Sequence, residues 1–96
     1  MPELRGHIDG KHNTYKVLLY ALSTCIWCRK TRQLLEDEDV TFDFVYVDLV
    51  DAEERRMARE HIRQFSDRTS FPAVIFDDAD CIIGYKPDAI KERLGI

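Results

Sequence analysis

STCIWCRK, residues Ser23–Lys30, is the most informative stretch of this chain. Its cysteines, Cys25 and Cys28, lie three positions apart, after an apolar run over 17–22 and before a segment rich in good helix formers. We expect Cys25 at or just before the first helical turn, where free backbone N–H groups and the helix dipole favour negative charge. A thiol there loses its proton more easily, and the thiolate is the nucleophile. Strand, C-x-x-C and helix together indicate a thiol–disulfide site.

The neighbours of the two cysteines suggest how such a site works. Cys28, one helical turn after Cys25, can attack a mixed disulfide formed on Cys25. Arg29 and Lys30 are expected to lower the pKa of Cys25 further. Trp27 is expected to be partly exposed, either as an apolar contact for a substrate or packed against the loop at Phe71.

Outward from this stretch, the pattern predicts alternating strands and helices and therefore an α/β domain. Strands are expected at 15–22, about 43–48, 73–76 and 81–85, the last two forming a hairpin. Helices are expected at about 26–38, from Asp51 onward, and from Pro87 onward. Residues 1–14 are predicted to be an N-terminal arm, either irregular throughout or with one short strand, and residues 15–96 the domain.

The composition is that of one small globular domain. The chain has 96 residues, 45% hydrophobic and 33% charged, with a net charge of −4. This acidic balance argues against nucleic-acid binding, and no apolar run approaches the roughly 20 residues that span a membrane. Without a recognisable secretory signal, a cytoplasmic location and a monomer are expected.

With C-x-x-C after the first strand and Pro72 opening the third, the chain from about Lys16 to its end resembles the glutaredoxin branch of the thioredoxin fold. The resemblance implies a four-stranded mixed sheet, in the order β-α-β-α-β-β-α, flanked by three helices. It implies a dithiol–disulfide oxidoreductase that reduces protein or small-molecule disulfides through Cys25 and Cys28. It also implies a cis Phe71–Pro72 bond that presents the backbone of Phe71 beside Cys25, where an extended substrate could pair with it.

Some positions depart from the glutaredoxin pattern. Ile26 and Trp27 replace the usual Pro-Tyr between the cysteines, and Tyr85 replaces the second glycine of a Gly-Gly pair. The segment after it, Lys86-Pro87-Asp88, is similar to the ending of the glutaredoxin-like hydrogen donors of ribonucleotide reductase. The electron donor is therefore open between glutathione, another low-molecular-weight thiol and a thioredoxin-reductase-type flavoprotein.

Other interpretations of the cysteines remain. We expect no metal and no resident cofactor, but Cys25, Cys28 and Cys81 with a histidine could form a metal site if the fold brought them together. Cys25 from each of two chains, with external thiols, could hold an iron–sulfur cluster. A non-catalytic redox sensor is the third alternative. Cys81 alone is expected to be a small hydrophobic residue in a strand, with a second redox role as the other possibility.

The second helix carries a basic side. Arg55, Arg56, Arg59 and Arg63 lie in it, and Arg68 follows in the next loop. Such a side is either a solvated surface or a docking surface for an acidic partner. The expected partners are disulfide-containing proteins and a reductant.

Overall fold

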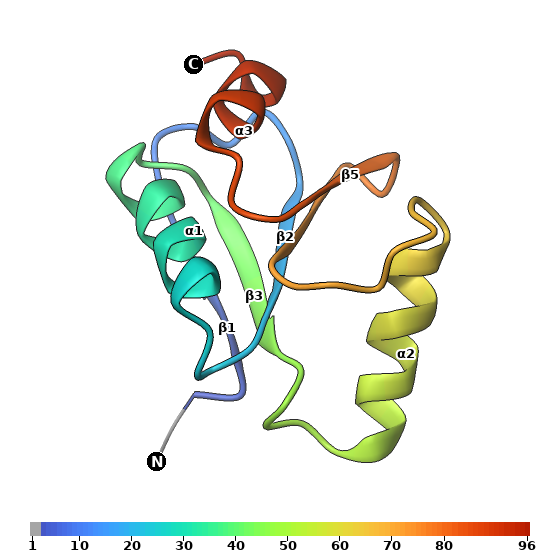
Figure 1. Ribbon diagram of the computed structural model, residues 1–96. Helices are drawn as coiled ribbons and strands as arrows, with labels where there is room; N and C mark the ends of the chain where they lie inside the picture. Colours follow the sequence, from blue (N-terminus) through green and yellow to red (C-terminus); the bar gives the residue numbers. More distant parts are fainter. Residues whose placement is uncertain (1–2) are drawn as a thin grey trace.

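The computed structural model describes residues 3–96. Eight elements follow one another along the chain (Figure 1): β1 (Arg5–Ile8), β2 (Val17–Ala21), α1 (Ile26–Asp37), β3 (Phe42–Tyr46), α2 (Ala52–Arg63), β4 (Ala73–Phe76), β5 (Asp80–Ile83) and α3 (Pro87–Leu94). All three helices and the four strands from β2 to β5 occur in the predicted order, with boundaries that differ by a few residues.

The strands form one mixed sheet in the order β1-β3-β2-β4-β5. β2 and β3 are parallel, with α1 as the crossover between them. The other neighbouring pairs are antiparallel. Because β2 and β3 run in the same direction, the loops that follow them meet at one edge of the sheet. Cys25 lies in the loop after β2.

The prediction of four strands is wrong, because the sheet has a fifth strand, β1. It comes from the segment that was expected to be an N-terminal arm, and it pairs antiparallel with β3, from Arg5 opposite Val45 to Ile8 opposite Phe42. A four-residue strand containing glycine carries little sequence signal. It forms because it supplies hydrogen-bond partners to the outer edge of β3, which would otherwise be unpaired.

Two apolar clusters lie on opposite faces of the sheet. On one face, Val17, Leu19 and Ala21 of β2 pack with α1 and α3 residues such as Leu35 and Ile90. On the other face, Tyr20 packs with Ala58 and Ile62 of α2 and with residues of β4. Side chains alternate between the faces of a strand, so β2 serves both clusters. Figure 1 shows α2 well separated from α1 and α3.

The helix ends follow ordinary capping chemistry. The Asp51 carboxylate accepts a hydrogen bond from Glu54 N–H at 2.8 Å at the start of α2, as its acidic first turn predicted. Pro87 occupies the first turn of α3, as predicted, and Gly95 ends that helix with a φ of +74°. Within residues 3–96, none of the helices has both the length and the hydrophobicity to cross a membrane.

Candidate functional site

Cys25 is the residue that caps α1. Its backbone is extended (φ −91°, ψ 121°), and its sulfur accepts a hydrogen bond from the Cys28 N–H at 3.2 Å. Cys25 is half-buried, so its sulfur lies between solvent and the positive end of the helix. This is the predicted position, and a negatively charged sulfur accepts such a bond more strongly than a neutral thiol does.

Cys28 differs sharply from Cys25 in its surroundings. It is 1% exposed and packs in the cluster beneath α1. Its sulfur accepts a hydrogen bond from Leu22 N–H at 3.4 Å. Burial, together with the neighbouring Cys25, raises the pKa of Cys28 to about 12. Cys28 is therefore a protonated, shielded thiol, while Cys25 can be reached from outside, which matches the roles of resolving and attacking cysteine.

The loop before Cys25 is held by Asp48, which the sequence analysis missed. The Asp48 carboxylate accepts hydrogen bonds from the backbone N–H of Ser23, at 2.9 Å, and from its hydroxyl. Partial burial opposes ionisation, but these hydrogen bonds outweigh it and lower the pKa of Asp48. The parallel pairing of β2 and β3 could have identified Asp48, because it brings together the residues that follow both strands.

A shallow cavity of about 270 Å³ lies beside the cysteines. Trp27 and Tyr85 form one part of its wall, with stacked rings whose centroids lie 5.8 Å apart. Phe71, Pro72 and Gly84 complete it, and the Phe71–Pro72 bond is cis, as the resemblance implied. The structure thus brings three predicted substrate-binding residues together and adds Tyr85, which the sequence analysis noted only as a departure from a glycine pair.

Arg29 and Lys30 are both exposed on the first turns of α1. The Lys30 ammonium lies over the Trp27 ring, 5.0 Å from its centroid. This places one cation on the cavity wall rather than on the Cys25 sulfur. A role of either residue in the acidity of Cys25 stays a prediction.

Cys81 does not join the other two cysteines. It packs on the face of the sheet that α2 covers, whereas Cys25 and Cys28 pack on the opposite face. Burial raises the pKa of Cys81. Within residues 3–96 no three His, Cys, Asp or Glu side chains are arranged to hold a metal ion. A metal site built from all three cysteines is therefore incompatible with this fold.

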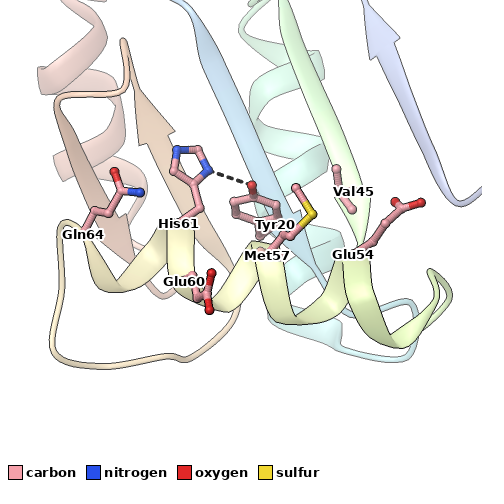
Figure 2. A pocket seen from close by; sticks show the side chains of 8 residues that line it. Tyr20, Val45, Glu54, Met57, Glu60, His61 and Gln64 are labelled. Carbon is pink, nitrogen blue, oxygen red and sulfur yellow. Dashed lines mark hydrogen bonds between the residues drawn. The ribbon is translucent and has the colours of Figure 1, made fainter.

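A second cavity, of about 440 Å³, lies elsewhere, between α2 and the sheet. Figure 2 shows Tyr20, Met57 and His61 along it. The Tyr20 hydroxyl and Nδ1 of His61 are 2.7 Å apart, and Nε2 of His61 lies 2.8 Å from the Asp78 carboxylate. His61 is thus a packed histidine whose two ring nitrogens are both hydrogen-bonded.

Similar proteins were found in three comparisons. Residues 17–80 match the family model described as Glutaredoxin. The crystal structure of a glutaredoxin from Methanosarcina mazei superposes with a TM-score of 0.92 at 42% identity, covering 98% of this chain and 90% of that one. Methanoredoxin from Methanosarcina acetivorans superposes with a TM-score of 0.84, also at 42% identity, over 88% of both chains. An uncharacterised glutaredoxin-like protein of the rubredoxin operon of Clostridium pasteurianum is 33% identical over 81% of this chain and 96% of its own length.

The family match, the superpositions and the geometry of Cys25 and Cys28 all lead to the same fold and the same family. The fold is the thioredoxin fold with an added edge strand, and it supports a thiol–disulfide redox function. This chain belongs to the glutaredoxin family.

Proposed function

We propose that this protein is a dithiol–disulfide oxidoreductase that uses Cys25 and Cys28 to reduce disulfides of proteins or small molecules. The observation that carries the proposal is the contrast between the two sulfurs. The Cys25 sulfur is accessible and accepts the Cys28 N–H, whereas the Cys28 sulfur is buried one helical turn away. Substrate and reductant can thus reach only one sulfur directly, and the second acts on what is bound there.

The proposed reaction has two exchange steps. The Cys25 thiolate attacks one sulfur of the substrate disulfide, a new S–S bond forms, and the other substrate sulfur leaves as a thiolate. Cys28 then loses its proton and attacks the Cys25 sulfur, which releases the second substrate sulfur. Two electrons have passed to the substrate, and Cys25 and Cys28 are left as a disulfide. The two substrate thiolates take up the proton that Cys28 lost and a second proton from solvent. An external dithiol or two thiol molecules reduce this disulfide again.

The surroundings support further proposals about partners. The electron donor is a low-molecular-weight thiol such as glutathione or a thioredoxin-reductase-type flavoprotein, and the targets are disulfide-containing molecules that enter the cavity at Phe71. The protein works as a cytoplasmic monomer without a resident cofactor. Each of these extends the resemblance to glutaredoxins and rests on the same accessible cysteine.

Turnover is the test of the proposed function. The reduced protein, at a small fraction of the substrate concentration, is mixed with hydroxyethyl disulfide or an oxidised peptide and with dithiothreitol as donor. A catalyst converts many equivalents of disulfide per protein molecule, faster than dithiothreitol alone. Conversion of a single equivalent followed by a halt would identify a redox sensor and reject the proposal.

Trp27 is proposed to hold the substrate through apolar contact, because it is 52% exposed beside Phe71 and Pro72. We expect Trp27→Ala to raise the KM for a peptide disulfide with an adjacent aromatic residue by about fivefold, the equivalent of ~1 kcal/mol. Reduction of hydroxyethyl disulfide, which lacks such a side chain, should keep its rate. Steady-state kinetics on both substrates measure this.

Ile26 supplies the matched control for Trp27. It lies between the same cysteines and is 56% exposed, but it is not part of the cavity wall. Ile26→Ala should leave both substrates unchanged. Equal losses in the two variants, or equal losses on the two substrates, would show that Trp27 supports the structure of the turn rather than the substrate.

A further inference from the structure

Twelve of the fourteen Lys and Arg side chains of this acidic protein fall into two groups, and Lys11 and Arg55 belong to neither. In the first group, each cation forms an ion pair with a carboxylate, and most of these pairs hold one element to another. Its members are Arg5, Lys16, Arg32, Arg56, Lys91 and Arg93. These ion pairs help to stabilise the fold itself.

The second group lies on α1 and α2 and in the segments next to Phe71 and Tyr85. Arg29 and Lys30 lie on the first turns of α1, Arg59 and Arg63 on α2, Arg68 in the loop that leads to Phe71, and Lys86 directly after Tyr85. Within residues 3–96, none of these six forms an ion pair with a carboxylate. The acidic residues in the same segments are Glu53, Glu54, Glu60, Asp67 and Asp88. When Arg55 and Arg56 of α2 are counted as well, the cations still outnumber these carboxylates, so the balance of charge there is positive.

Three arginines form one side of α2, which we name the arginine flank: Arg55, Arg59 and Arg63, each four residues after the last. A groove of about 320 Å³ runs along it, lined also by Ala52, Arg56 and Glu60. Like charges at this spacing destabilise a helix, and within the described residues neither Arg59 nor Arg63 forms an ion pair with a carboxylate. The arrangement is unfavourable for the isolated protein and favourable for binding an anion.

The arginine flank borders loops that also reach the cysteines. The Arg55 guanidinium donates to the carbonyls of Val47 and Val50, at 3.0 and 3.2 Å. The segment between them contains Asp48, which holds Ser23 in front of Cys25. At the other end of α2, Nε of Arg63 approaches the Thr69 hydroxyl at 3.4 Å, in the loop that continues into Phe71. A chain bound at Phe71 can therefore continue along α2.

We propose, on the basis of the oxidoreductase function proposed above, that the arginine flank binds an acidic polypeptide segment of the protein whose disulfide is reduced at Cys25. From Arg55 to Arg63 the helix rises by roughly 12 Å, and the remaining cations lie on α1, on the 66–70 loop and after β5. A low-molecular-weight thiol at Cys25 is too small to contact all of them. A polypeptide crossing the cavity spans this distance, and carboxylates along it would complete the missing ion pairs.

Two synthetic peptides test the proposal. They share one internal disulfide and differ only in the residues that follow it, four glutamates in one and four glutamines in the other. The pre-reduced protein is mixed with each in single turnover, at low and at high salt. We expect the glutamate peptide to be reduced about tenfold faster at low salt, and this preference to disappear at high salt, where surface charges are screened.

Variants of α2 assign the preference to these arginines. Arg59→Gln with Arg63→Gln should bring the rates of the two peptides within about twofold of each other and leave the glutamine peptide unaffected, whereas lysine at both positions should retain the preference. Lys11→Gln with Lys91→Gln removes the same charge at the other end of the molecule, where Lys91 pairs with Glu38 at the end of α1. That control should behave as the unmodified protein does.

The outcomes separate this proposal from the one it rests on. Reduction of both peptides at equal rates, or a preference that survives the Arg59→Gln and Arg63→Gln changes, would overturn the docking surface and leave the oxidoreductase intact. If neither peptide is reduced, the oxidoreductase proposal fails. Calorimetry then tests the docking surface independently of reduction. It compares how tightly the glutamate peptide, with serines in place of its cysteines, binds to the unmodified protein and to the variant with Arg59→Gln and Arg63→Gln. Equal affinities would reject the docking surface.

Discussion

Replacement of Cys25 by serine is expected to reduce the rate of disulfide reduction by a factor of at least ~10³. A serine hydroxyl is not ionised near neutral pH and cannot form the mixed disulfide, so the first exchange step has no nucleophile. The remaining thiol cannot replace it, because Cys28 is 1% exposed and burial raises its pKa. Turnover of hydroxyethyl disulfide with dithiothreitol measures the loss.

Cys28→Ser is the informative partner of this variant. It keeps the nucleophile and loses the residue that resolves the mixed disulfide, so the protein should accumulate covalently joined to its substrate through Cys25. Mass spectrometry of the non-reduced sample should show one substrate thiol added per chain. Cys81 lies on the opposite face of the sheet, so Cys81→Ser should leave turnover unchanged.

Full turnover by the Cys25→Ser protein would withdraw the assignment of the nucleophile. Rapid alkylation of Cys28 by iodoacetamide at neutral pH in the unmodified protein would contradict the division of roles in a different way. It would mean that the buried sulfur is accessible and ionised, against its burial and its raised pKa.

Phe44→Ala is expected to cost the folded state about 3–5 kcal/mol, the usual loss for a buried aromatic ring. Phe44 is 1% exposed in the middle of β3. Its ring lies under Gly6 of β1, where an added Cβ would meet the ring at 2.7 Å, and the Arg32 guanidinium covers it at 4.2 Å from the centroid. Removing the ring leaves a void that touches β1, β3 and α1 together.

Urea unfolding followed by Trp27 fluorescence measures this change. Since small domains are stable by only about 5–15 kcal/mol, Phe44→Ala should unfold at much lower urea. Met57→Ala is the control, because Met57 is 56% exposed and should change stability by less than about 0.5 kcal/mol. A loss below about 1 kcal/mol for Phe44→Ala would show that the surrounding residues collapse into the void or that β1 contributes little.

Local patterns in the chain were sufficient for most of the architecture. The apolar run before Cys25, Asp51 at the start of α2 and Pro87 in the first turn of α3 each reflect short-range preferences that the folded chain keeps. Cys25 at the helix cap follows from the same reasoning, because a helix that begins directly after the first cysteine directs its free N–H groups at that residue.

Such local patterns do not predict contacts between segments that are far apart in the sequence. β1 has four residues including Gly6, and it exists because β3 offers an edge some 35 residues later in the chain. Asp48 reaches Ser23 only because β2 and β3 lie side by side. Tyr85 meets Trp27 only because the hairpin of β4 and β5 brings it to the start of α1.

The amino-acid sequence by itself determined which atoms we propose to carry the chemistry, since the spacing of Cys25 and Cys28 and the helix that begins between them are local properties. The tertiary structure alone decided how unlike the two sulfurs are, which side chains form the wall beside them, and which cations are left without carboxylate partners. Burial and charge pairing depend on distant segments that pack together, and a one-dimensional pattern does not contain those distances.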